Sequence, residues 1–120
     1  EAQARAMGCL PSRILRASAM GVSGQSSDRV LRLVQAVSGT EYITGHGAYS
    51  YLDHQAMNDA GVAVSYMDYA PHPWAQAHGD FSPYVTGLDL LAAVGSAAVT
   101  HLCPAKLDWR AFRDAEEQAK

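Results

Sequence analysis

The chain has 120 residues, of which 48% are hydrophobic and 18% charged, a composition typical of a globular protein with one modest core. Its formal net charge of −3 leaves no broad basic surface, so a nucleic-acid partner is not expected. No apolar run approaches the roughly 18 residues of a membrane span, and residues 1–13 lack the pattern of a signal peptide.

The first third of the chain predicts a helix end, a strand and a second helix. Residues 1–7 have the composition of a helix, which Gly8 would close, and the apolar run 13–17 predicts a strand. Ser27 is a candidate N-cap for the next helix, and Gly39 is expected to end that helix. The apolar face of this helix is formed by Val30, Leu33, Val34 and Val37.

The central third predicts a β-α-β unit. An apolar strand over residues 40–44 leads into the glycine loop Gly45-His46-Gly47. Asp53 can then cap a helix over 54–60, which Gly61 would end, and residues 62–67 form the next strand. The crossover helix predicts that the two strands are parallel, with functional groups in the loop that follows the first of them.

A long aromatic loop and two helices are expected in the last third. The loop spans residues 70–84 and contains three prolines. Thr86 and Asp89 fit a capping box at the start of the next helix. Residues 105–120 predict an appended terminal helix. The apolar face of the capped helix is expected to consist of Leu88, Leu91, Ala92 and Gly95.

Neither the cysteines nor the histidines predict a metal site. Cys9 and Cys103 lie far apart, which leaves two alternatives, free thiols or one long-range disulfide. No two histidines have the spacing of a metal-binding motif, although His72, His78, Asp80 and His101 all lie in the last third. The loop Gly45–Ala48 also lacks the spacing and the lysine of a nucleotide-binding motif, so no cofactor can be named.

These elements predict an α/β fold with a small, mostly parallel sheet of about three strands flanked by helices. The length predicts a single domain over residues 1–120. Because the chain opens in a helical stretch without an initiator Met, we interpret it as part of a larger domain.

The order of several motifs resembles the WbqC-like family. The segment TEYITGHGAYSYLDHQAMNDAGVAVSYMDY is similar to the family's YLSG-x-x-x-x-YL strand and loop, which F-x-x-x-GI follows. Residues 69–76, YAPHPWAQ, resemble its Y-P-Q loop, and residues 81–91, FSPYVTGLDLL, its F-x-P-x-L-S-x-x-D-L-L motif. This chain departs from the pattern at Trp74, Ala75 and Thr86, where the family has Tyr, Pro and Ser.

The resemblance covers residues 12–95 and carries several expectations. It implies that the chain is the C-terminal half of a longer WbqC-like domain, because the Q-P-x-Y-x-P opening is absent. It also implies a cytoplasmic bacterial transferase linked to surface-polysaccharide (O-antigen) biosynthesis. Such an enzyme would move an amino acid or acyl group from an activated donor to a sugar or amine acceptor.

His46 and Tyr49 are the candidate catalytic residues. His46 stands between Gly45 and Gly47, where the backbone could approach a substrate and the imidazole could act as a general base. The alternative is a loop histidine that faces water. Tyr49 could position a substrate or relay a proton, or it could be a packing anchor.

Four further residues are candidates for substrate binding. Gln76 could bind a carboxylate, an amide or a sugar hydroxyl through paired hydrogen bonds, or it could hold the shape of its own loop. Asp89 could contact the substrate or serve only as a helix cap. His72 and Trp74 lie in the same loop as Gln76. We expect the His46 and Gln76 loops to meet at the strand ends, and a non-catalytic sugar- or protein-binding domain is the alternative function.

Overall fold

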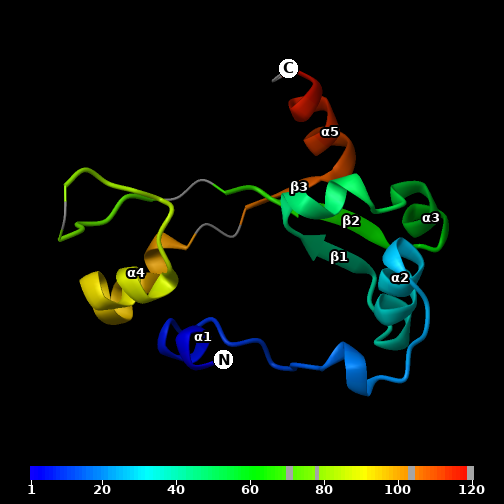
Figure 1. The fold of residues 1–120 in the computed structure, drawn as a ribbon, viewed down its shortest axis with the longest axis horizontal. Coiled ribbons are helices and arrows are strands. Elements are labelled where there is room, and N and C mark those ends of the chain that lie inside the picture. The colour runs from blue at the N-terminus through cyan, green and yellow to red at the C-terminus, as the bar shows by residue number, and fades with distance from the viewer. Residues whose placement is uncertain (70–71, 78, 103–104, 119–120) are drawn as a thin grey trace. The chain divides into compact units, whose positions relative to one another are not determined.

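The computed structural model of the protein describes residues 1–69, 72–77, 79–102 and 105–118, which fall into two compact units (Figure 1). We call Leu15–Asp68 together with Ala105–Lys120 the sheet unit, and Glu1–Ile14 together with Tyr69–Pro104 the helical unit. Both units are therefore built from segments that are far apart in the sequence. No helix within the described ranges combines the length and the apolar character that a membrane crossing requires.

The sheet is mixed. Strand β1 (Glu41–Thr44) pairs in parallel with β2 (Ala63–Met67), and β2 pairs antiparallel with β3 (Lys106–Asp108), in the order β1-β2-β3 (Figure 1). Strands β1 and β2 and their parallel pairing are confirmed, but the prediction of a mostly parallel sheet is wrong. The third strand comes from the C-terminal tail, where three residues are too few to show the period of a strand.

The strand predicted over residues 13–17 does not form. Residues 13–16 are irregular, and a short 3₁₀ helix, η1, spans Ala17–Ala19. Ile14 and Leu15 remain 49% and 45% exposed. Without a neighbouring strand, an apolar run of this length has neither hydrogen-bonded partners nor a core to face.

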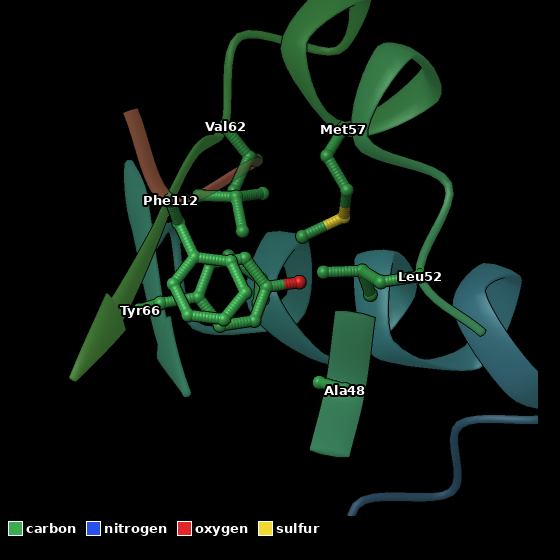
Figure 2. Packing of buried hydrophobic residues seen from close by; sticks show 8 residues of the cluster. Ala48, Leu52, Met57, Val62, Tyr66 and Phe112 are labelled. Atoms are coloured by element: carbon green, nitrogen blue, oxygen red, sulfur yellow. The ribbon is translucent and has the colours of Figure 1, made fainter. Parts of the chain in front are cut away.

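The core of the sheet unit lies on one face of the sheet. Tyr42, Val64, Tyr66 and Leu107 share this face through the strand register, and they pack with residues of α2 (Ser26–Ala36), α3 (His54–Asp59) and α5 (Trp109–Gln118). Figure 2 shows the rings of Tyr66 and Phe112 overlapping at the centre. The opposite face carries a polar network, in which Glu41 accepts hydrogen bonds from Ser65 and Lys106. The buried members of the core are Val34, Ala48, Leu52, Met57, Val62, Val64, Tyr66 and Phe112.

Helix α2 begins two residues earlier than predicted and ends in a Schellman-type turn. Ser27 does not cap it; its Oγ accepts a hydrogen bond at 2.8 Å from the backbone N–H of Asp53, the residue that precedes α3. At the other end Ser38 takes the left-handed conformation (φ 55°), and the Gly39 N–H donates to the Val34 carbonyl. A Cβ on Gly39 would lie 2.9 Å from Val34 Cγ1, so the glycine is needed for close packing.

The segment between β1 and β2 contains two short helices. The expected open glycine loop is in fact a 3₁₀ helix, η2 (His46–Ser50). The predicted caps of the following helix are confirmed: the Asp53 carboxylate accepts from the Ala56 N–H at 2.9 Å, and Gly61 has φ +76°. These contacts involve neighbours in the sequence, which is why they could be predicted.

The helical unit contains α1 (Ala2–Ala6), α4 (Gly87–Val94) and the 3₁₀ helix η3 (Gly95–His101). Gly8 closes α1 with φ +71°, and Thr86 caps α4, as predicted. The expected buried face of α4 is wrong, because Leu88 is 58% exposed whereas Leu90 is 3% exposed and packs with Met7. In a helix rich in Leu and Ala, several faces of the helix are equally apolar. The sequence therefore does not determine which face is buried.

The C-terminal tail is more than an appended helix. Residues 106–108 form strand β3, and the predicted helix begins only at Trp109. Phe112, on the first turns of α5, is only 5% exposed and belongs to the core of the sheet unit. The tail therefore contributes both a strand and a core residue.

Candidate functional site

His46 lies at the carboxyl end of the parallel strand pair. It opens η2, two residues after β1 ends, and its Nε2 is 2.7 Å from the carbonyl oxygen of Met67, the last residue of β2. Because β1 and β2 are parallel, both strands end at the same edge of the sheet. Open α/β sheets bind their ligands at this edge.

The contact with Met67 defines the state of the neutral imidazole. A carbonyl oxygen can only accept, so Nε2 of His46 carries the proton and donates it. The lone pair of the neutral ring is then on Nδ1. The ring packs against Phe112 in a tilted arrangement, with 4.7 Å between the ring centroids and 51° between the ring planes. The exposed His46 therefore has a defined tautomer when it is neutral.

Gly45 and Gly47 flank His46 in the sequence. Neither Gly45 nor Gly47 has a positive φ, and a Cβ added to either would meet no atom within 4 Å. The backbone conformation therefore does not require glycine at these positions.

Tyr49 lies in an aromatic cluster beneath this edge. Its ring is 5.5 Å from Phe112, 6.0 Å from Tyr66 and 5.4 Å from His54. These are the contacts of a packing anchor, the second of the two alternatives for this residue. His46 and Tyr49 share Phe112 as a neighbour.

A second histidine, which sequence reasoning did not single out, forms a pair with Tyr66. The His54 Nε2 and the Tyr66 hydroxyl oxygen are 2.7 Å apart, and the His54 ring stacks on Trp109 at 4.9 Å. Burial raises the pKa of Tyr66 to about 12. Burial also lowers the pKa of His54, against a smaller opposing effect of Asp53. The sequence could have indicated this pair, because Tyr66 occupies an inward-facing position of a strand, where a buried hydroxyl needs a hydrogen-bond partner.

Gln76 holds the loop in which it lies. Its Nε2 donates to the Ser82 carbonyl at 3.0 Å, and its Oε1 accepts from the Ser82 N–H at 2.8 Å. The same Nε2 lies 3.2 Å from Oδ2 of Asp89. These bonds match the alternative in which the glutamine shapes its own loop.

Asp89 links this loop to α4. Its Oδ2 accepts from the indole N–H of Trp74 at 2.8 Å as well as from Gln76. The capping-box prediction is therefore wrong for Asp89, although Thr86 caps the helix through its own hydroxyl. Phe81 packs edge-on to Trp74 at 4.9 Å. Trp74 is consequently an aromatic side chain of fixed orientation.

The remaining candidates are the other histidines and the two cysteines. His72 is exposed, and its carbonyl oxygen accepts from His101 Nδ1 at 3.2 Å. His78 and Cys103 lie outside the described residues, and Cys9 is exposed and free. Within the ranges that the structure describes, no three His, Cys, Asp or Glu side chains are grouped to hold a metal ion.

The candidates divide between the two units. The first group, which belongs to the sheet unit, consists of His46, Tyr49, Gly45 and Gly47. The second group, the candidates for substrate binding in the last third of the chain, belongs to the helical unit. The meeting of the two loops in one pocket stays a prediction. The members of the second group are His72, Trp74, Gln76 and Asp89.

Comparison with known proteins agrees with the sequence motifs. The model of the WbqC-like protein family matches residues 2–101. The chain is also 35% identical over 77 residues to Uncharacterized protein Rv1507c of Mycobacterium tuberculosis. That match covers 63% of this chain and 33% of the relative, so the chain spans about a third of the relative's length. No solved structure matches the chain.

Proposed function

Because the chain belongs to the WbqC-like protein family, we propose that it forms part of a cytoplasmic transferase of bacterial surface-polysaccharide (O-antigen) biosynthesis. The reaction is the transfer of an amino acid or acyl group from an activated donor to a sugar or amine acceptor. The observation that carries the proposal is the bond from His46 Nε2 to the Met67 carbonyl oxygen at the carboxyl edge of the parallel strands.

In the proposed step, His46 acts as the general base. Nδ1 removes the proton from the hydroxyl or amine of the acceptor. The oxygen or nitrogen of that acceptor group attacks the acyl carbonyl carbon of the donor. A C–O or C–N bond forms, the bond from that carbon to the leaving group breaks, and the leaving group departs with the electron pair. The proton on His46 can then pass to the leaving group.

The exposure of His46 and the tautomer that Met67 defines support this role. His46 is exposed, and neither of its neighbours in the sequence, Gly45 and Gly47, has a side chain that could block an acceptor. The donor bond to Met67 stabilises the Nε2–H tautomer, which is the form with a basic Nδ1.

The first experiment identifies the substrate class. A thermal-shift screen of the complete protein against nucleotide-sugars, amino acids and activated acyl donors would reveal ligands by stabilisation of the folded state. Transfer between the ligands found is then assayed with His46→Gln. The glutamine Nε2 can still donate to Met67, but the residue lacks a base, so turnover should fall about 10²- to 10⁴-fold with the melting temperature unchanged.

A matched control distinguishes loss of the base from loss of any histidine. His101 also bonds a backbone carbonyl, but through Nδ1, so His101→Asn is the equivalent change in the helical unit. It should leave turnover near the wild-type value. Unchanged turnover in His46→Gln would contradict the catalytic role.

The alternative is a non-catalytic sugar- or protein-binding domain, which the fixed orientation of Trp74 favours. Its indole is held by Asp89 and packed by Phe81, as in aromatic platforms that stack on sugar rings. If Trp74→Ala abolishes ligand binding while His46→Gln leaves binding and cellular function intact, the binding function replaces the transferase.

A further inference from the structure

Helix α5 brings two arginines to one tryptophan. The guanidinium carbon of Arg110 lies 4.6 Å from the centroid of the Trp109 ring, and that of Arg113 lies 5.7 Å from the same ring. The two arginine side chains are 50% and 42% exposed. Two cations beside one ring repel each other, so an anion with oxygen atoms for both guanidinia would relieve the repulsion.

The acidic partners of these arginines can be exchanged for another anion. Asp108 Oδ1 is 3.8 Å from Nη1 of Arg110, but it also accepts from the Arg110 backbone N–H at 2.9 Å and so caps the start of α5. Arg113 bonds its neighbour Asp114 at 2.9 Å, in a pair whose side chains are 42% and 57% exposed. Exposed pairs of this kind contribute little to stability, so a doubly charged anion can replace the carboxylates.

The arginines lie on the helix that contacts the candidate catalytic residues (α5, red in Figure 1). The ring of Phe112, on the same helix, is 4.7 Å from that of His46 and 5.5 Å from that of Tyr49. The pKa of Arg113 is raised, chiefly by its hydrogen bond with Asp114 and to a smaller extent by the charge of an ionised Tyr49. The Arg113 guanidinium is therefore within electrostatic range of Tyr49.

We propose that Arg110 and Arg113 bind the phosphate group of the activated donor. The inference rests on the proposed transferase function, since phosphate is a good leaving group on an acyl carbon. The guanidinium fork matches two phosphate oxygens. As the bond from the acyl carbon to the phosphate oxygen breaks, that oxygen takes the electron pair, and the guanidinia stabilise its negative charge. Both arginines lie beyond residue 101, where the match to the family model ends.

Titration with inorganic phosphate tests the site without an activity assay. The chain has two tryptophans, so Trp74→Phe assigns the indole N–H signal of Trp109 in ¹H–¹⁵N spectra. At constant ionic strength, phosphate should shift this signal to saturation, whereas acetate, with one charge on two oxygens, should not. Equal shifts with phosphate and acetate would overturn the assignment to phosphate.

Substitutions with opposite effects sharpen the test. Arg110→Gln and Arg113→Gln should each weaken phosphate binding about 10- to 100-fold, because each removes charged hydrogen-bond donors. Asp114→Asn should tighten the binding, because it removes the carboxylate that competes with phosphate. Arg32→Gln is the matched control, since Arg32 is 53% exposed and pairs with Asp28 on α2 at 2.9 Å. It removes the same charge from an equivalent pair and should leave phosphate binding unchanged.

The outcomes separate this inference from the proposed function. Phosphate binding that is unchanged in both Arg110→Gln and Arg113→Gln, or weakened as much in Arg32→Gln, would overturn the inference, whatever His46→Gln does to turnover. Unchanged turnover in His46→Gln would instead overturn the catalytic role of His46. Once a donor is identified, Arg113→Gln should lower kcat/KM for it. Loss of phosphate binding with an unchanged kcat/KM would show that the arginines bind free phosphate rather than the donor.

Discussion

The Nε2 of His54 and the hydroxyl oxygen of Tyr66 lie 2.7 Å apart, and this contact joins the first residue of α3 to the central strand of the sheet. Tyr66 has 0% of its surface exposed, so its hydroxyl depends on the histidine for a partner. His54 in turn stacks on Trp109 of α5. This hydrogen bond and ring stack therefore link α3, β2 and α5.

The sheet unit should lose stability as the pH falls below neutrality. Burial holds the pKa of His54 below its ordinary value of 6.5, so the unfolded chain binds a proton more readily than the folded one. The contribution is fully present above pH 6.5 and is lost as the pH falls from there toward the folded pKa. Urea midpoints at a series of pH values should decline in this window.

The variant His54→Gln should remove this part of the pH dependence. The loss that stems from Glu41 occurs at lower pH, because its hydrogen bond with Lys106 holds its pKa below the ordinary value of 4.5 and its contribution is lost as the pH falls through that lower value. The two contributions can therefore be separated. An unchanged slope around pH 6 in His54→Gln would contradict the assignment.

Replacing Tyr66 by Phe should destabilise the sheet unit by about 1 to 3 kcal/mol, because His54 loses the partner of its Nε2. The change retains the ring stacked on Phe112. Tyr84, which is 95% exposed, offers the matched control, and Tyr84→Phe should leave stability unchanged. Equal denaturation midpoints for the Tyr66 variant and the wild type would show that the hydrogen bond contributes nothing.

Gly39→Ala should destabilise the turn after α2 by about 1 to 3 kcal/mol, because the added Cβ would crowd Val34 in a packed region. Gly45→Ala is the control, since a Cβ at that position meets no atom within 4 Å. Chemical denaturation of both variants tests this difference. A Gly39 variant as stable as the Gly45 variant would mean that the backbone relaxes around the extra carbon.

Asp89→Ala should loosen the aromatic loop of the helical unit. The change removes the acceptor that Trp74 and Gln76 share, and an unpaired partly buried donor costs about 1 to 3 kcal/mol. Tryptophan emission should shift to longer wavelength as the Trp74 indole becomes mobile. Asp80→Ala, at an exposed aspartate, is expected to leave the emission unchanged.

The elements whose causes are local could be predicted from the sequence. Asp53, Thr86 and Gly61 mark helix ends through hydrogen bonds or backbone angles that involve residues at most a few positions away. The alternation over residues 62–67 and the crossover helix predicted the parallel pair, and with it the position of His46 at the strand ends. The family was also recognisable from motifs along the chain.

Tertiary structure alone decided the features that join distant segments. Strand β3 is defined by pairing with β2 some forty residues away, and Ser27 bonds Asp53 rather than its own helix. Phe112 reaches His46, and His54 reaches Tyr66, only because the fold brings α5 and α3 onto the same face of the sheet. Periodicity and capping report interactions within a few residues, whereas these contacts depend on which of several apolar surfaces pack together in three dimensions.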